Sequence, residues 1–293
     1  MEDHDHSLAA DLQAMLSMAT GRRQSLRWLL AGAALPMMGC GGGSSDSTST
    51  DTTSSNTGTS TGTNTGTNTG TNTGTGTTSC SVIPEETGGP YPGDGTNSNS
   101  SGVVNVLNMS GIVRQDIRSS FAGATGTAAG VPLTIKLHII NANNSCGVAS
   151  NFAVYLWHCD REGRYSLYSS GVTNQNYLRG VQEADANGDV TFTTIFPGCY
   201  DGRMPHVHFE VYRTLAASVS ASNRIKTSQF TFPMATLNEA YASSGYSTSV
   251  TNLARISYAT DNIFSDGYSL QLASMTGNAT DGYVATLTLA VAA

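Results

Sequence analysis

The stretch "DVTFTTIFPGCYDGRMPHVHFEVY", residues 189–212, contains two strand-like runs joined by a turn. Its first and last seven residues are rich in β-branched and aromatic side chains, which favour extended strands. Gly and Pro lie between the runs and favour a turn. Runs of the same kind recur at residues 131–140, 152–158, 164–169, 227–232, 268–274 and 283–291. Many short strands with closely spaced turns predict an all-β fold, an antiparallel β-sandwich.

Three other segments of this region have different patterns. Residues 235–245 and 251–258 have brief helical character, so we expect short helices there, in the loops of the sandwich. The segment "DANGD", residues 185–189, begins like a calcium-binding loop but lacks the glutamate that completes one. We therefore expect a hairpin turn at this position.

The first forty residues predict export. Arg22 and Arg23 precede an apolar run, residues 29–38, that is too short to span a membrane, so residues 1–40 are predicted to be a signal peptide. The arginine pair resembles a twin-arginine signal, with an ordinary secretory signal as the alternative. Cys40 follows Gly39 as in a lipoprotein attachment site. We expect an exported protein, periplasmic or attached to the membrane through a lipidated Cys40.

Composition separates a linker from a folded domain. Residues 41–79 consist almost entirely of Gly, Ser, Thr and Asn, and predict a disordered tether. The folded domain is expected over residues 80–293. A net charge of -7, with 12% charged residues, argues against a nucleic-acid partner.

The cysteines fit an oxidising compartment. Cys146 and Cys159 flank a loop and the start of a strand, and we expect them to form a disulfide. Cys80 and Cys199 would then remain as a second pair, with a free thiol at Cys199 as the alternative.

Two histidines in the opening stretch predict a metal site. Alternate strand residues share a face, so His206 and His208 can converge on one ion, and this spacing fits zinc, copper, iron or nickel. A pair of surface histidines is the simpler alternative. Tyr200 lies just upstream, and Fe(III) holds a phenolate well, which favours iron. Glu210 shares the same alternation, so a cupin-like Fe(II) site of two histidines and one carboxylate also fits.

Longer motifs resemble a known family. "EETGGPYPG" (85–93), "WHCDREGRYSLYS" (157–169) and "YLRGVQEADANGDVTFTTIFPGCYDGRMPHVHF" (177–209) are similar to the intradiol ring-cleavage dioxygenases. This family includes the protocatechuate 3,4-dioxygenases and the catechol 1,2-dioxygenases. The resemblance covers residues 80–293, and its order of Gly-Arg-Tyr, Pro-Gly-x-Tyr, Arg and His-x-His is highly specific.

The resemblance implies a metal centre. Family members are β-sandwiches that hold non-haem Fe(III) by two tyrosinates and two histidines. Carried over by motif, the ligands would be Tyr165, Tyr200, His206 and His208, with Tyr168 as the rival of Tyr165. The family's enzymes cleave a catechol ring with O2 between its two hydroxylated carbons and release a muconate-type dicarboxylate.

The resemblance also implies roles around the metal. Tyr200 would leave the metal and accept a substrate proton, and Arg203 would bind substrate and stabilise its developing negative charge. Gln229 would order the site, and Tyr91 would line the substrate mouth. Cys199 replaces a bulky aromatic residue that is usual in secreted relatives. The alternative to an enzyme is a surface lipoprotein that keeps the sandwich without turnover.

Overall fold

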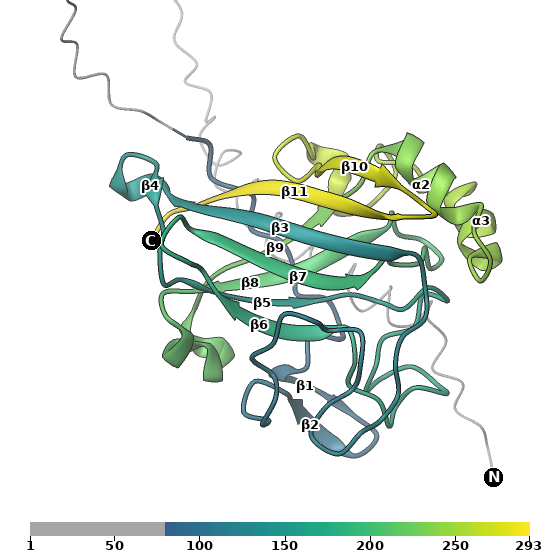
Figure 1. Cartoon of the computed structure of the whole chain (residues 1–293), viewed down its shortest axis with the longest axis horizontal. Helices are drawn as coiled ribbons and strands as arrows, with labels where there is room; N and C mark the ends of the chain where they lie inside the picture. The colour runs from purple at the N-terminus through teal and green to yellow at the C-terminus, as the bar shows by residue number, and fades with distance from the viewer. Residues whose placement is uncertain (1–79) are drawn as a thin grey trace, which may run out of the picture. The chain divides into compact units, whose positions relative to one another are not determined.

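The computed structural model describes residues 80–293. The predicted signal peptide, the linker and Cys40 therefore lie outside the described residues. Two β-sheets stack face to face and enclose a hydrophobic core, which confirms the predicted all-β sandwich (Figure 1). Within residues 80–293, no helix is both long and apolar enough to cross a bilayer.

Each layer of the sandwich is one sheet. The first has the order β10-β11-β3-β4, and β7 also pairs with β3; the strands are β10 (Ser274–Asn278), β11 (Gly282–Val291), β3 (Pro132–Asn141), β4 (Gly147–Val148) and β7 (Asp189–Ile195). The second has the order β6-β5-β8-β9, with β6 (Arg179–Glu183), β5 (Ala153–Trp157), β8 (His206–Tyr212) and β9 (Arg224–Thr231). Pairing is antiparallel except between β11 and β3, which run parallel.

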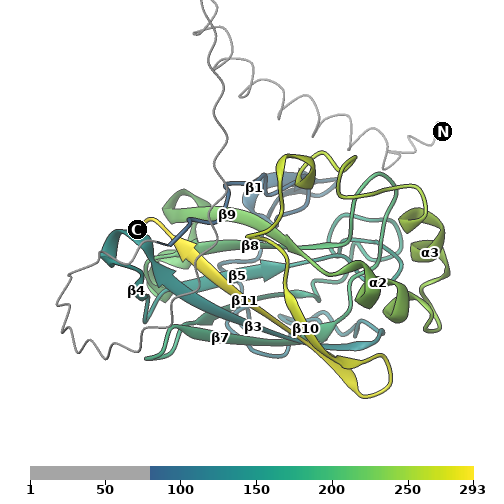
Figure 2. The same ribbon diagram turned by 90° about the horizontal axis from the view of Figure 1, so that it is seen from above.

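The remaining elements decorate this sandwich. The hairpin of β1 (Asp94–Asn99) and β2 (Gly102–Asn105) lies on the side of the four-stranded sheet that faces away from the other sheet (Figures 1 and 2). Helices α2 (Met234–Tyr241) and α3 (Ser247–Leu253) lie together at one end of the sandwich. The short 3-10 helices are η1 (Ala142–Asn144), η2 (Leu215–Val219), η3 (Ala221–Asn223) and η4 (Phe264–Asp266).

Most sequence predictions of elements are confirmed, and three are wrong. The expected strand at 164–169 is a turn, and residues 268–273 form a turn and an isolated bridge before β10 begins at Ser274. Residues 185–189 form a tight turn closed by the Asp185 carboxylate, but not a hairpin, because β6 and β7 belong to different sheets. The second expected helix begins earlier, at Ser247. Side-chain patterning identifies extended runs well, yet it cannot tell which sheet a strand joins.

Strand β8 is buried along its whole length. Its odd-numbered residues, Val207, Phe209 and Val211, enter the core between the sheets. Its even-numbered residues point to the outer face, which is also covered and fully buried. The two predicted histidines therefore lie inside the protein rather than on its surface.

The disulfide joins Cys80 to Cys146, which corrects the expected Cys146–Cys159 pair. Cys159 and Cys199 are both free and buried. The alternative of a free thiol at Cys199 is thus confirmed.

Loss of the disulfide should destabilise the domain. The bond closes a 66-residue separation, for which chain entropy predicts about 4 kcal/mol of stabilisation. The double variant Cys80→Ser/Cys146→Ser should therefore unfold at lower denaturant concentration, as followed by circular dichroism. Reducing agent should lower the midpoint of the unmodified protein and leave that of the double variant unchanged. An equal effect of reductant on both proteins would contradict the assignment.

Candidate metal centre

The outer face of the four-stranded sheet carries the predicted residues in cross-strand rows. His208 lies opposite Trp157 of β5 on one side and Gln229 of β9 on the other, and Trp157 in turn lies opposite Arg179 of β6. Side chains that are paired in this way point to the same side of a sheet. The register thus brings residues from four strands into one layer.

The two histidines meet at their ring nitrogens. Nε2 of His206 lies 3.1 Å from Nε2 of His208. Nδ1 of His206 lies 2.6 Å from the carbonyl oxygen of Met204, which can only accept, so Nδ1 carries the proton and the Nε2 lone pair is free. Trp157 stacks in parallel on His208, with ring centroids 5.0 Å apart, and fixes the plane of that imidazole.

Tyr200 reaches the histidines from the loop that enters β8. Its Oη lies 3.1 Å from Nε2 of His206. Two glycines allow this loop to pack closely against the turn that contains Arg161 and Gly163. A Cβ at Gly198 would lie 2.6 Å from the carbonyl oxygen of Arg161, and Gly163, at φ +84°, packs directly against Tyr200. The Pro-Gly-x-Tyr motif is therefore a closely packed turn that places the phenol of Tyr200 beside His206.

Tyr165 arrives from a turn rather than from a strand. Its Oη lies 3.3 Å from Nε2 of His206, and its ring packs edge to face with that of Tyr200. The turn is held by hydrogen bonds from the backbone amides of Tyr168 and Ser169 to the Tyr165 carbonyl. Tyr168, the rival, instead accepts a hydrogen bond from the backbone of Gly93. The structure thus brings Tyr165, and not Tyr168, to the histidines.

Burial dominates the electrostatics of these four groups. It lowers the pKa of both His206 and His208 well below the usual histidine value, with a further lowering by the nearby cationic groups. It also raises the pKa of Tyr165 well above that of a free phenol, and the neighbouring Tyr200 adds to this. The pKa of Tyr200 is raised by the same desolvation. In the protein alone the cluster is therefore neutral, and the hydroxyl groups of Tyr165 and Tyr200 lie within hydrogen-bond distance of the unprotonated Nε2 of His206.

The donor set fits a metal ion. Atoms bound to one ion at about 2.0–2.2 Å lie about 2.8–3.6 Å from each other. The three contacts made by Nε2 of His206, at 3.1, 3.3 and 3.1 Å, fall in this range. Imidazole nitrogens are common ligands of transition-metal ions, and phenol oxygens suit a hard cation. Tyr165, Tyr200, His206 and His208 are thus suited to hold one.

Glu210 does not join this cluster, which contradicts the two-histidine, one-carboxylate alternative. Its Oε2 accepts a hydrogen bond from Tyr212 at 2.5 Å, and Asp94 lies beside it. Burial, followed by the charge of Asp94, raises the pKa of Glu210 to about 8. Within residues 80–293, no group of three or more His, Cys, Asp or Glu side chains could hold a metal. A candidate metal site therefore arises in this part of the chain only when tyrosines are counted as ligands.

Arg203 lies fully buried beside the cluster and is clamped in place. Its Nε donates to Oδ2 of Asp261 at 2.9 Å, and its Nη2 donates to Oε1 of Gln229 at 2.8 Å. Gln229 donates in turn to the carbonyl of Thr87 at 2.8 Å. Nη1 of Arg203 is buried, and the clamp leaves this amino group without a hydrogen-bond partner in the described structure.

Sequence reasoning missed the two polar residues that hold these segments together. Asp261 lies 58 positions after Arg203 and also accepts hydrogen bonds from the backbone amides of Met204, Ile263 and Phe264. Arg179 is buried and donates to the carbonyls of Tyr91, Pro92 and Ser166. No spacing signal connects such distant positions.

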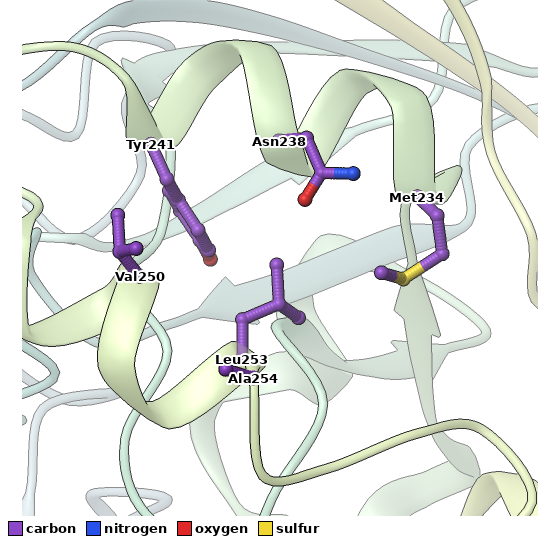
Figure 3. A pocket seen from close by; sticks show the side chains of 6 residues that line it. All are labelled: Met234, Asn238, Tyr241, Val250, Leu253 and Ala254. Atoms are coloured by element: carbon purple, nitrogen blue, oxygen red, sulfur yellow. The ribbon is translucent and has the colours of Figure 1, made fainter.

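Tyr91, expected at the substrate mouth, packs against the first tyrosine of the cluster. Its ring centroid lies 5.1 Å from that of Tyr165 and 5.1 Å from that of Tyr168. It also lines a cavity of about 540 Å³. A smaller hollow of about 280 Å³ lies between α2 and α3 (Figure 3), where none of the predicted site residues occurs.

Comparisons with known proteins find similarity to dioxygenases. Residues 113–227 match the family model Dioxygenase_C, described as a dioxygenase. An intradiol ring-cleavage dioxygenase from Tetranychus urticae is 24% identical, with a TM-score of 0.56, and the match covers 73% of this chain and 95% of that chain. The dioxygenase domain of a carbohydrate-binding fusion protein from Streptomyces sp. SirexAA-E is 22% identical, with a TM-score of 0.44, covering 72% and 99%.

No curated protein matches the chain. The family model includes Tyr165, Tyr200, Arg203, His206 and His208 within its matched residues. Residues 113–227 thus match a dioxygenase family model, and the chain shares the fold of an intradiol ring-cleavage dioxygenase, in line with the resemblance that its motifs indicate.

Proposed function

We propose that this protein is a non-haem Fe(III)-dependent intradiol dioxygenase. It cleaves a catechol-type ring with O2 between the two hydroxylated carbons and releases a muconate-type dicarboxylate. The observation that carries the proposal is the convergence of two phenol oxygens and two imidazole nitrogens in one buried cluster. A binding module without turnover has no need for two phenols directed at two imidazoles.

The donor set favours Fe(III) among the metals that imidazole accepts. Phenolates are hard, anionic ligands, and a trivalent hard cation offsets the desolvation that holds both tyrosines protonated in the protein alone. Tyr165, Tyr200, His206 and His208 would hold the ion. When bound, Fe(III) would draw electron density from a chelated catechol and make its ring reactive toward O2.

The chain's own residues would bind and orient the catechol. Nη1 of Arg203 is a donor for negative charge that develops on the substrate, and the clamp by Asp261 and Gln229 removes the need to reorient it. Oη of Tyr200 would accept a substrate proton. The buried setting of both groups excludes water and strengthens these interactions.

We also propose that the enzyme acts outside the cytoplasm. The signal-like residues 1–40 support export, and Cys40 is the residue through which a lipid would attach the chain to a membrane. The Cys80–Cys146 disulfide agrees with an oxidising compartment.

The iron-loaded chain should absorb visible light and cleave catechols. Tyrosinate bound to Fe(III) gives a strong visible band, so we expect this band together with one iron per chain. A catechol panel incubated under ¹⁸O2 should give dicarboxylates that carry both labelled atoms. Tyr200→Phe should weaken the band and lower kcat by roughly 100-fold or more. Tyr168→Phe is the matched control and should retain both properties, because Tyr168 lies outside the cluster.

Two results would overturn the proposal. A colourless protein that binds no iron after reconstitution would contradict the proposed Fe(III) cofactor. Aldehyde-bearing products, formed by ring cleavage beside the diol, would contradict the proposed intradiol cleavage. A spectrum unchanged in Tyr200→Phe would exclude Tyr200 alone.

Asp261 is predicted to support catalysis through Arg203. Asp261→Asn keeps the size of the side chain but removes the charge opposite the guanidinium. We expect kcat to fall roughly 10- to 100-fold while iron content and the visible band persist, because misorientation of a catalytic group slows the reaction. The exposed Asp281→Asn should behave like the unmodified enzyme. Unchanged kcat in Asp261→Asn would show that Arg203 is held without this carboxylate.

A further inference from the structure

The loop of residues 197–200 carries Tyr200 to the histidines and belongs to no strand. All four of its residues are buried, and buried backbone N–H and C=O groups need partners. One bond comes from the turn after β5, where the carbonyl of Asp160 accepts from the amide of Gly198 at 3.0 Å. Further partners are side chains of the two helices at the end of the sandwich.

Helix α3 holds both peptide groups of Cys199, the residue before Tyr200. The amide of Cys199 donates to Oγ of Ser249 at 2.9 Å, and Nδ2 of Asn252 donates to the carbonyl of Cys199 at 2.8 Å. Ser249 and Asn252 are three positions apart, so they lie on the same face of the helix. One helix face thus binds the chain on both sides of the Cys199 α-carbon.

The Asn252 hydrogen bond acts on the peptide unit that leads into Tyr200. The carbonyl of Cys199 and the α-carbon of Tyr200 belong to the same planar unit, so a bond to that carbonyl restrains the plane and the start of the tyrosine side chain. At the far end of that side chain, Oη of Tyr200 lies 3.1 Å from Nε2 of His206. A rotation of the plane would therefore move the phenol relative to the imidazole.

Two further hydrogen bonds connect the helices to this region. Oη of Tyr241, in α2, donates to the carbonyl of Pro197 at 3.0 Å, at the start of the loop. Oγ of Ser249 donates to the carbonyl of Arg161 at 3.4 Å, in the turn that packs against the loop. Tyr241 and Ser249 are buried, so water does not compete for these bonds. The helix pair thus holds the loop along its length.

We propose that Ser249 and Asn252 are positioning residues for Tyr200. This inference rests on the proposed function, in which the phenol of Tyr200 accepts a substrate proton. The contacts with α3 hold the backbone while the phenol moves, so that the phenol returns to the same place after each turnover. Both residues act through the backbone of Cys199 rather than at the reacting atoms, so they should affect kcat more than KM.

A double-mutant cycle on the iron-loaded enzyme tests this role with the best substrate of the catechol panel. Asn252→Leu keeps nearly the size of the side chain, removes the donor and adds no charge. It should lower kcat roughly 10-fold, with KM within about twofold, because a misplaced catalytic group slows the reaction. In the Tyr200→Phe background the same substitution should change kcat by less than about twofold, because the phenol that Asn252 positions is absent. The exposed Thr251→Ala, also in α3, is the control and should leave kcat unchanged.

Hydrogen exchange on the metal-free protein gives a measurement that does not depend on turnover. Ser249→Ala removes the acceptor of the Cys199 amide, so peptides that contain this amide should exchange faster, by about tenfold or more. Peptides from β8 should exchange as in the unmodified protein, because the loop opens without the sheet. Thr251→Ala should leave both sets of peptides unchanged.

Three results would contradict the role of α3. These are an unchanged kcat in Asn252→Leu, an equal loss of kcat with and without the Tyr200 phenol, and unchanged exchange at Cys199 in Ser249→Ala. If Ser249→Ala does not fold by circular dichroism, the cycle with the half-buried Asn252 decides the outcome alone. An unmodified protein that neither binds iron nor cleaves catechols would contradict the proposed function instead, and faster exchange in Ser249→Ala would still show that α3 holds this loop.

Discussion

The burial of strand β8 on both of its faces is the constraint on which the rest of this structure depends. Its odd-numbered side chains are apolar and complete the core between the sheets. Its even-numbered side chains are polar or aromatic and are equally buried. A buried polar group must find a partner or lose stability. The contacts on the outer face of β8 depend on which partners satisfy its polar side chains, His206, His208, Glu210 and Tyr212.

The two ends of the strand satisfy it differently. His206 and His208 stay neutral, and Nε2 of His206 lies against both phenol oxygens and Nε2 of His208, an arrangement that the proposed Fe(III) would complete. Glu210 and Tyr212 bond to each other, and a second carboxyl group lies beside them. Around both groups, buried arginines connect segments that are far apart in sequence. Arg179 joins the segment of Tyr91 to the turn of Tyr165, so the positions of the two rings are linked.

The sequence predicts the parts of this site that depend on strand periodicity. The alternation in "HVHFEVY" places both histidines on one face, and the turn before it brings Tyr200 to the same end of β8. Tyr165 follows only from family motifs, because the "RYSLYS" run has strand-like composition but folds as a turn. Asp261, the Cys80–Cys146 disulfide and the parallel pairing of β3 with β11 depend on contacts across 58 or more residues, which local pattern does not encode.

Glu210 shows why spacing alone does not define a metal site. It continues the His-x-His alternation and shares a face with both histidines, yet the segment 87–94 covers that face and divides it. A Cβ at Gly88 would lie 3.8 Å from both Trp157 and Thr227, so this segment lies over the boundary between the two rows. Beyond it, Asp94 supplies the neighbour of Glu210. The covering chain, rather than the strand, therefore decides which alternate side chains meet the two tyrosines and which line a separate cavity.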